Sequence, residues 1–231
     1  MRQEGACSQI DGRTLMTTDY AKTSLAPPIW VLAIAVSAAN VGISLLSPAI
    51  PQLRDDLMVT SDEAQLVLSA FLIMLGVGQL IAGSLSDRIG RRPVLVYGSL
   101  LFLLSGLGAL FSTSIEMLVA MRIFQGLGAA TCMAMGRVII SDSFQRAEAG
   151  RQMSTITMFQ SVVPLLGFAF GGVMADLVGW RGSVGLMVVT AAIVFLGTSL
   201  LLAESRDPSI KPVQASRIIV VYGQLLVTPL F

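Results

Sequence analysis

The sequence predicts an all-α membrane protein with six transmembrane helices, arranged as two inverted three-helix repeats. Hydrophobic residues make up 54% of the 231 residues and charged residues only 13%. The mean hydropathy of +0.78 excludes an ordinary soluble domain. The apolar residues gather into six charge-poor spans, and one glycine–aspartate–glycine–arginine skeleton occurs twice. These three observations predict the fold class.

Each span is long enough to cross a bilayer, because roughly 20 helical residues cover ~30 Å of hydrocarbon. The predicted helices are residues 29–50, 64–85, 94–115, 117–140, 153–175 and 182–203. Five contain no charge, whereas the fourth carries Arg122 and Arg137. Residues 51–63 form the longest predicted external loop. Within it, Thr60 followed by Glu63 predicts a capped start for the second helix.

The repeated skeleton relates the two halves of the predicted bundle, with a constant offset of 89 residues. The first copy is Gly83, Asp87, Gly90 and Arg92, and the second is Gly172, Asp176, Gly179 and Arg181. Each copy closes an apolar span, and an odd number of spans separates them, so they should lie on opposite faces of a membrane. Inverted repeats of this kind build many secondary transporters, with the substrate path between them.

Basic residues concentrate on the side of the bundle that holds both chain ends. Twelve of the 15 Lys and Arg residues lie there, against Arg54 and Arg181 on the other side. Positive charge stays cytoplasmic during insertion. We therefore expect a multi-pass protein of the cell inner (plasma) membrane with both termini in the cytoplasm.

Sequence patterns of enzymes and of metal sites are missing. The chain has no histidine, and Cys7 lies far from Cys132. No nucleotide-binding glycine loop, metal-ligand cluster or nucleophile–base pair is present. We expect no catalytic residues, no cofactor, no metal and no nucleic-acid partner.

Four segments resemble transporters of the major facilitator superfamily. Residues 83–92 resemble the signature that follows helix two in that superfamily. Residues 118–130 are similar to the helix-four signature of its drug:proton antiporter branch, and Asn40 with Pro48 and Leu53 fits the helix-one pattern of the branch. Residues 136–142 look like the helix-four ending of the bicyclomycin-resistance (Bcr/CflA) multidrug efflux subfamily.

The resemblance runs from about Ile29 to Phe231 and covers one half of a twelve-helix protein. It implies a cytoplasmic tail over residues 1–28, a six-helix bundle over residues 29–203, and a cytoplasmic linker over residues 204–231. The linker would lead toward a missing second half. That half would belong to the same chain if this one is truncated, or to a dimer partner.

The resemblance also implies a conformational latch after the second helix. Its residues would be Gly83, Asp87, Arg88, Gly90, Arg91 and Arg92. A tight turn needs Gly90, and Asp87 can accept bonds from helix-start amides or pair with Arg91 or another arginine. The alternative is that the arginines only set orientation through the positive-inside bias. Asp176 is either an acid near the substrate path or the counterpart of Asp87 in the second repeat.

Arg122 is the leading candidate for coupling, since a charge within a span costs about 2.5–3.5 kcal/mol on insertion scales. The resemblance implies a part in proton transfer or substrate coupling. The alternative is an arginine that snorkels to the external headgroups. The residues expected to line the substrate path are Asn40, Gln79, Arg122, Gln125 and Gln160.

The fifth helix departs from the antiporter pattern, which expects Gly-Pro-x-x-Gly-Gly. This chain has Phe168 in place of that proline, and Pro164 lies four residues earlier. Because proline removes a helical hydrogen bond, Pro164 is the expected source of a bend. The bend residues are Pro164, Gly167, Gly171 and Gly172.

The predicted function is proton-coupled efflux of small, drug-like compounds by alternating access. The implied partners are a small-molecule substrate, protons, the lipid bilayer and a second six-helix half. One alternative is metabolite uptake by the same fold. Another is a truncated or dimerising half without transport of its own.

Overall fold

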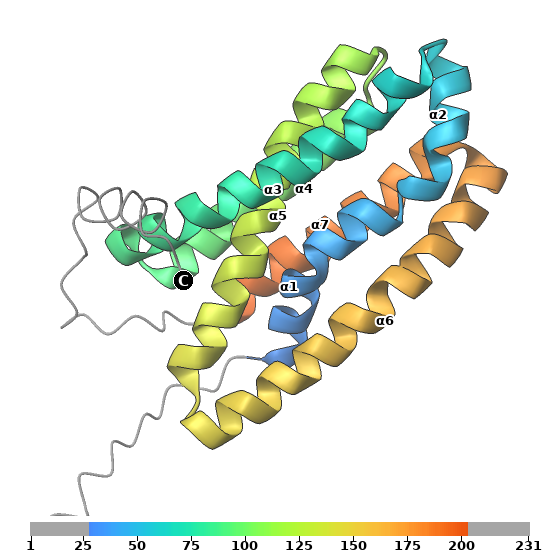
Figure 1. The fold of residues 1–231 in the computed structure, drawn as a ribbon. Coiled ribbons are helices and arrows are strands. Elements are labelled where there is room, and N and C mark those ends of the chain that lie inside the picture. The colour runs from blue at the N-terminus through green and yellow to red at the C-terminus, as the bar shows by residue number, and fades with distance from the viewer. Residues whose placement is uncertain (1–27, 203–231) are drawn as a thin grey trace, which may run out of the picture.

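The computed structural model describes residues 28–202, which form helices joined by short turns and contain no β-strand (Figure 1). The elements in chain order are α1 (Ile29–Ser44), the 3₁₀ turn η1 (Ser47–Ala49), α2 (Ile50–Leu57), α3 (Ser61–Ile89), α4 (Arg91–Leu110), α5 (Ile115–Ser143), α6 (Arg146–Val178) and α7 (Trp180–Leu201). Six stretches are long and apolar enough to cross a membrane. The predicted all-α fold with six spans is therefore confirmed. The predicted linker, and the predicted tail apart from Pro28, lie outside the described residues.

The first span is interrupted, which the hydropathy pattern did not predict. α1 ends at Ser44, and the chain continues through η1 into α2. Pro48 and Pro51 stand in the first two positions of η1 and α2. A proline without an N–H is tolerated at a helix start but breaks a helix interior. The prediction of a loop over residues 51–63 was wrong in its first part, because residues 51–57 are helical.

The predicted cap at the start of α3 is confirmed. The Thr60 hydroxyl accepts a bond from the Glu63 N–H at 3.3 Å, and the Glu63 carboxylate accepts one from the Thr60 N–H at 2.8 Å. This reciprocal pair satisfies two backbone donors that a helix start leaves open.

The two copies of the repeated skeleton adopt the same local structure. Gly90 ends α3 and begins α4 with φ 103°, and Gly179 ends α6 and begins α7 with φ 82°. Only glycine adopts this backbone region readily. Arg92 at the start of α4 donates to the Ser199 carbonyl near the end of α7, at 2.9 Å. Arg181 at the start of α7 donates to the Ser112 carbonyl just past α4, at 3.0 Å. The two antiparallel helices thus exchange equivalent arginine contacts at opposite ends of the bundle.

Glycines bring the helices close together. A Cβ on Gly126 would lie 2.5 Å from the Phe71 carbonyl oxygen of α3, and one on Gly128 would lie 2.6 Å from the Phe102 nitrogen of α4. α5 therefore packs backbone to backbone between α3 and α4. Lipid provides no hydrophobic drive for pairing helices, so such close contact supplies much of the association.

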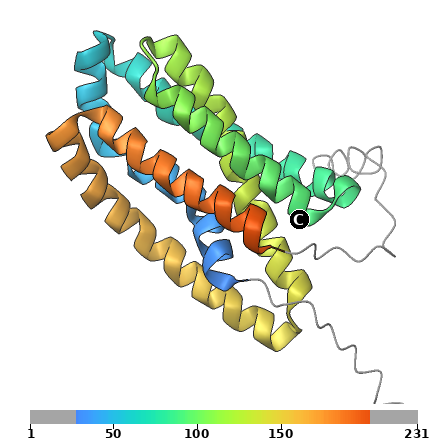
Figure 2. The same cartoon turned by 180° about the vertical axis from the view of Figure 1, so that it is seen from behind.

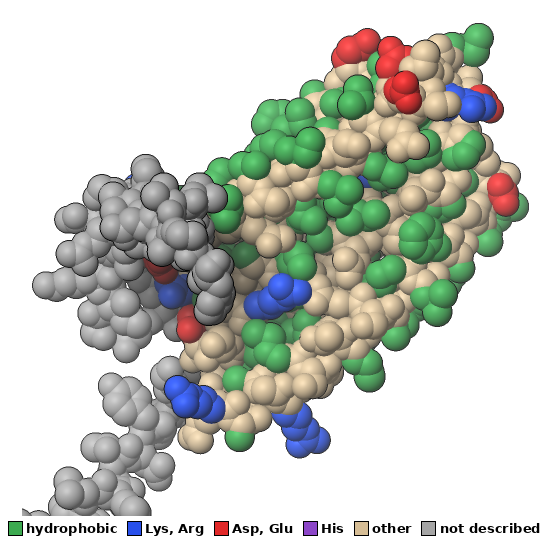
Figure 3. All heavy atoms as spheres, viewed as in Figure 1, with side chains coloured by type: hydrophobic (Ala, Val, Ile, Leu, Met, Phe, Trp, Pro, Cys, Tyr) green, Lys and Arg blue, Asp and Glu red, His purple; other side chains and the backbone are tan. Residues whose placement is uncertain are grey.

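The bundle has two different broad faces. α1, α3, α5 and α6 lie toward the viewer in Figure 1, whereas α4 and α7 come forward when the molecule is turned around (Figure 2). α3 and α6 bury the smallest part of their apolar length. Apolar side chains are spread over the face that contains them (Figure 3). Such a surface suits lipid or an apolar protein partner.

Candidate functional site

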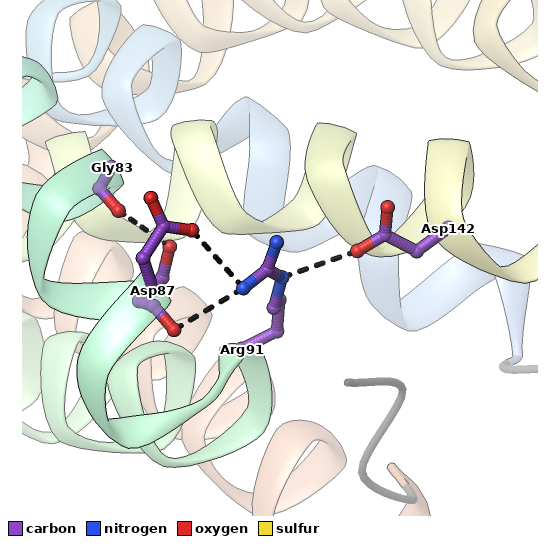
Figure 4. Close-up of polar contacts among 5 residues, drawn as sticks. Gly83, Asp87, Arg91 and Asp142 are labelled. Atoms are coloured by element: carbon purple, nitrogen blue, oxygen red, sulfur yellow. Dashed lines mark hydrogen bonds and ion pairs between the residues drawn. The ribbon is translucent and has the colours of Figure 1, made fainter. Parts of the chain in front are cut away.

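One polar cluster joins the ends of three helices at the arginine-rich end of the bundle (Figure 4). Arg91 pairs through Nη1 with Asp87 at 3.2 Å and through Nε with Asp142 at 3.2 Å. Its Nη1 also donates to the Ser86 carbonyl at 3.3 Å. We call Asp87, Arg91 and Asp142 the latch cluster. It connects the last turn of α3, the first residue of α4 and the last turn of α5.

The structure places the six predicted latch residues in different contacts. Gly83 lies beside the latch cluster, where its carbonyl accepts a bond from the Ser86 hydroxyl at 2.8 Å (Figure 4). Gly90 makes the turn that places Arg91. Arg92 instead points to α7 and contacts Ser199, while Arg88 lies in the last turn of α3. Asp142 was not among the predicted site residues. Its position in the 136–142 motif was the one signal for it.

A second polar cluster surrounds Arg122, which lies inside the bundle in the third turn of α5. The Arg122 side chain is fully buried. Its Nη1 donates to Gln125 Oε1 at 2.7 Å, and its Nη2 donates to the Gly42 carbonyl at 2.8 Å. The guanidinium carbon lies 4.8 Å from the centre of the Phe71 ring, and Nη1 lies 3.5 Å from the sulfur of Met187. This Arg122 cluster contacts α1, α3, α5 and α7, which rules out the snorkelling alternative in this structure.

The break in α1 explains how a buried arginine finds an acceptor there. Gly42 lies in the last turn of α1, and the carbonyls of a last turn have no partner within the helix. A cation at a helix C-terminus is also favoured by the helix dipole. Two donors remain open, because Arg122 Nε and Gln125 Nε2 are buried without a hydrogen-bond partner among the described residues. Buried donors of this kind usually bind ordered water or a ligand.

A third cluster links α1, α5 and α6. Asn40 Nδ2 donates to the Gln160 carbonyl at 3.1 Å, and Gln160 Nε2 donates to the Val36 carbonyl at 3.2 Å. Arg137 Nη2 donates to Gln160 Oε1 at 3.0 Å from an exposed position on α5. We call Asn40, Arg137 and Gln160 the Gln160 cluster. Arg137 was not among the predicted site residues, although a second charge within the fourth span was a signal for it.

The five predicted path residues fall into three separate groups of contacts. Arg122 and Gln125 share the Arg122 cluster, and Asn40 and Gln160 share the Gln160 cluster. Gln79 lies apart on α3, where its Nε2 is 3.5 Å from the sulfur of Met133. The three positions span the bundle between α3 and α6.

The predicted bend residues of α6 mainly provide close contact. α6 continues through Pro164 as one helix. A Cβ on Gly167 would overlap the Ser44 side chain, and one on Gly171 would overlap the Leu45 carbonyl. Gly172 has more room, since its nearest neighbour would be Pro48 Cβ at 4.0 Å. Two of the three glycines thus allow α6 to pack closely against the C-terminal end of α1.

At the opposite end of the bundle, the arginine of the second copy, Arg181, pairs with an acid from another helix. Asp56 of α2 accepts bonds from Trp180 Nε1 and Arg181 Nη1, both at 2.8 Å. Asp176 instead accepts a bond from Gln52 at 3.4 Å. In the structure, Asp56 rather than Asp176 therefore pairs with the repeated arginine. No group of three or more acidic or cysteine side chains within residues 28–202 is placed to hold a metal ion.

Residues 32–231 match the family model of the Major Facilitator Superfamily. The chain is 32% identical over 187 residues to a "Chloramphenicol resistance protein" of Pseudomonas aeruginosa, covering 79% of this chain and 42% of that protein. It is 32% identical over 187 residues to "Multidrug resistance protein D" of Escherichia coli, covering 81% of this chain and 46% of that protein. The chain thus spans about half the length of these relatives.

Solved structures show the same fold at low sequence identity. A D-xylose–proton symporter aligns with a TM-score of 0.69 and 16% identity, covering 86% of this chain and 52% of the symporter. A peptide transporter of the POT type aligns with a TM-score of 0.70 and 15% identity, covering 86% of this chain and 43% of that chain. In both cases the match corresponds to roughly one half of the transporter.

Proposed function

The chain belongs to the major facilitator superfamily, and from this premise we propose that it forms the amino-terminal half of a proton-coupled exporter of small, drug-like compounds. Two relatives at 32% identity are named for chloramphenicol and multidrug resistance, which supports this substrate class. The observation that carries the proposal is the fully buried Arg122, which ties four helices together without a carboxylate partner among the described residues. A membrane-buried cation of this kind is a functional-site hypothesis by default.

We place the latch cluster on the cytoplasmic side of the inner membrane. Among the described residues, the latch end carries most of the arginines, and the far end carries two. The latch-end set is Arg88, Arg91, Arg92, Arg146 and Arg151, and the far-end set is Arg54 and Arg181. This distribution supports cytoplasmic termini through the positive-inside rule.

A second six-helix half would cover the face formed by α1, α3, α5 and α6. Two helices of that face, α3 and α6, expose large apolar side chains, including Ile73, Leu80, Leu165 and Phe168. Gln79 of α3 and Arg137 of α5 are exposed as well, and both are costly to leave in lipid. The exposed fraction of Ile73 is 64% and that of Leu165 is 72%. Residues 204–231 would link the two halves if they belong to one chain.

Alternating access would use the polar clusters in different roles. The Gln160 cluster and Gln79 would line the substrate path, since they lie on the face toward the second half. The Arg122 cluster would couple proton movement to the rearrangement of the helices. A group that competes for the Gly42 carbonyl or the Gln125 amide would loosen the contacts of Arg122 to α1, and with them the packing of four helices. The latch cluster would hold one state by joining α3, α4 and α5.

The test of this function is export by cells that express the complete gene. We expect lower chloramphenicol accumulation than in cells with an empty vector, and we expect a protonophore to abolish the difference. Cells with an Arg122→Ala variant at matched membrane abundance should accumulate as much chloramphenicol as cells with the empty vector. Higher accumulation of a labelled metabolite, without drug export, would favour the uptake alternative. No flux in either direction would favour the half without transport of its own.

The latch is tested by replacing Arg91. Arg91→Gln removes both ion pairs of the latch cluster, so we expect the export rate to fall about threefold to tenfold, equivalent to roughly 0.7–1.4 kcal/mol. Arg146→Gln is the matched control, because it removes an exposed positive charge at the same end of the bundle. Asp142→Asn should lower export less when added to Arg91→Gln than on its own, as expected of interacting residues. Equal loss from Arg91→Gln and Arg146→Gln would show that these arginines only set orientation.

A further inference from the structure

A groove between α4 and α7 is lined by no residue of the three polar clusters. It has a volume of about 280 Å³ and is lined by Arg92, Pro93, Val96, Tyr97 and Ser199. Four of these residues come from the first turns of α4, and Ser199 comes from the last turn of α7. The groove therefore opens at the arginine-rich end of the bundle, between the two helices that face the viewer in Figure 2.

The mouth of the groove favours an anion. Arg92 uses Nη2 to bind the Ser199 carbonyl, and its Nε is buried without a partner among the described residues. No ion pair joins Arg92 to a carboxylate in the described part of the chain. The start of α4 has no acidic residue in its first turn and no side-chain cap. Open backbone donors and the positive end of the helix dipole add to the charge of Arg92.

Beyond Arg92 along α4, the residues that line the groove are apolar or aromatic. Pro93 and Val96 line it, and Tyr97 is 65% exposed. Tyr97 follows Arg92 by five residues, which is about 7.5 Å along a helix. The headgroup region on each side of a bilayer is about 5–7 Å thick. Arg92 and Tyr97 therefore match the two levels of that region, and tyrosine is enriched where headgroups meet acyl chains.

We propose that this groove binds an anionic phospholipid, with Arg92 holding the headgroup phosphate and Tyr97 lying against the glycerol and upper acyl chain. A guanidinium presents paired donors that suit phosphate oxygens, and basic pockets between helices on the cytoplasmic side bind anionic headgroups. The Arg92–Ser199 bond places the lipid where α4 begins and α7 ends, so the lipid would fasten these two helices together. Arg92 thus serves a lipid site, whereas its neighbour Arg91 serves the latch cluster.

The test is lipid retention by the purified protein, which needs no transport. The protein is delipidated in a neutral detergent, phosphatidylglycerol or phosphatidylcholine is added back, and bound lipid is counted by native mass spectrometry. We expect Arg92→Gln to weaken phosphatidylglycerol binding about fivefold and to leave phosphatidylcholine binding unchanged. Tyr97→Leu keeps the Arg92–Ser199 bond and should weaken phosphatidylglycerol binding about twofold to threefold. Arg146→Gln is the control for loss of one positive charge.

Two results would overturn the proposal. Equal phosphatidylglycerol binding in Arg92→Gln, Arg146→Gln and the unmodified protein would show that the groove holds no lipid. Displacement of phosphatidylglycerol by millimolar inorganic phosphate would show a site for a free anion instead. If Arg92→Gln fails to fold, the Tyr97→Leu result decides, because that side chain is largely exposed.

Discussion

Replacing Arg122 with alanine is expected to destabilise the purified protein by about 2–4 kcal/mol and to abolish export. The substitution leaves the Gly42 carbonyl and the Gln125 amide oxygen without their donor, and an unsatisfied buried group costs about 1–3 kcal/mol. It also opens a cavity beside Phe71, which adds to the cost. The variant no longer carries the cost of burying a charge, and this gain offsets part of the destabilisation. The measurement is the thermal unfolding midpoint in detergent, together with drug accumulation in cells.

Two further variants separate the structural part of this effect from the functional part. Arg122→Lys keeps the charge, but lysine lacks the planar guanidinium whose two nitrogens contact both acceptors. We therefore expect most of the stability loss to remain. Arg137→Gln removes the other arginine of α5, which is exposed and donates to Gln160. It should leave the unfolding midpoint nearly unchanged while lowering export. An Arg122→Ala protein with the melting behaviour and export of the unmodified protein would refute the coupling role.

Replacing Gly171 with alanine is expected to destabilise the bundle more than any other single-methyl change in α6. The new Cβ would overlap the carbonyl group of Leu45, and a backbone atom cannot move aside as a flexible side chain can. Overpacking of this kind typically costs about 1–3 kcal/mol. α6 would have to separate from α1 at the point where α1 is broken, close to the Gly42 carbonyl that binds Arg122. Export should therefore fall along with stability.

The neighbouring Gly172 provides a control in the same turn of the same helix. A Cβ there would meet only Pro48 at 4.0 Å. Gly172→Ala should be neutral or stabilising by up to about 1 kcal/mol, because alanine is the better helix former. Both variants are compared by thermal unfolding in the same detergent. Equal midpoints for Gly171→Ala and Gly172→Ala would mean that the two helices are not in close backbone contact.

Local features of this chain were predictable because their causes lie within a few residues. Runs of apolar residues gave the six spans, and Thr60 with Glu63 gave the start of α3. Gly90 and Gly179 gave the two turns of the repeat, since a sharp turn between long helices needs a residue that tolerates positive φ. The break in α1 was not predicted, although Pro48 and Pro51 were visible in the sequence. Hydropathy measures only how apolar a segment is, whereas the break arises because proline lacks a backbone N–H.

The sequence by itself determined the class of this protein, its spans, its inverted repeat and the residue types at its polar positions. Only the tertiary structure decided their partners. Arg122 meets Gly42 across 80 residues and Met187 across 65, and Arg91 meets Asp142 across 51. The adjacent Arg91 and Arg92 diverge because successive residues of a helix point about 100° apart, so one faces α5 and the other α7. Which helix stands in each direction depends on how α4 packs, and that follows from contacts between distant parts of the chain.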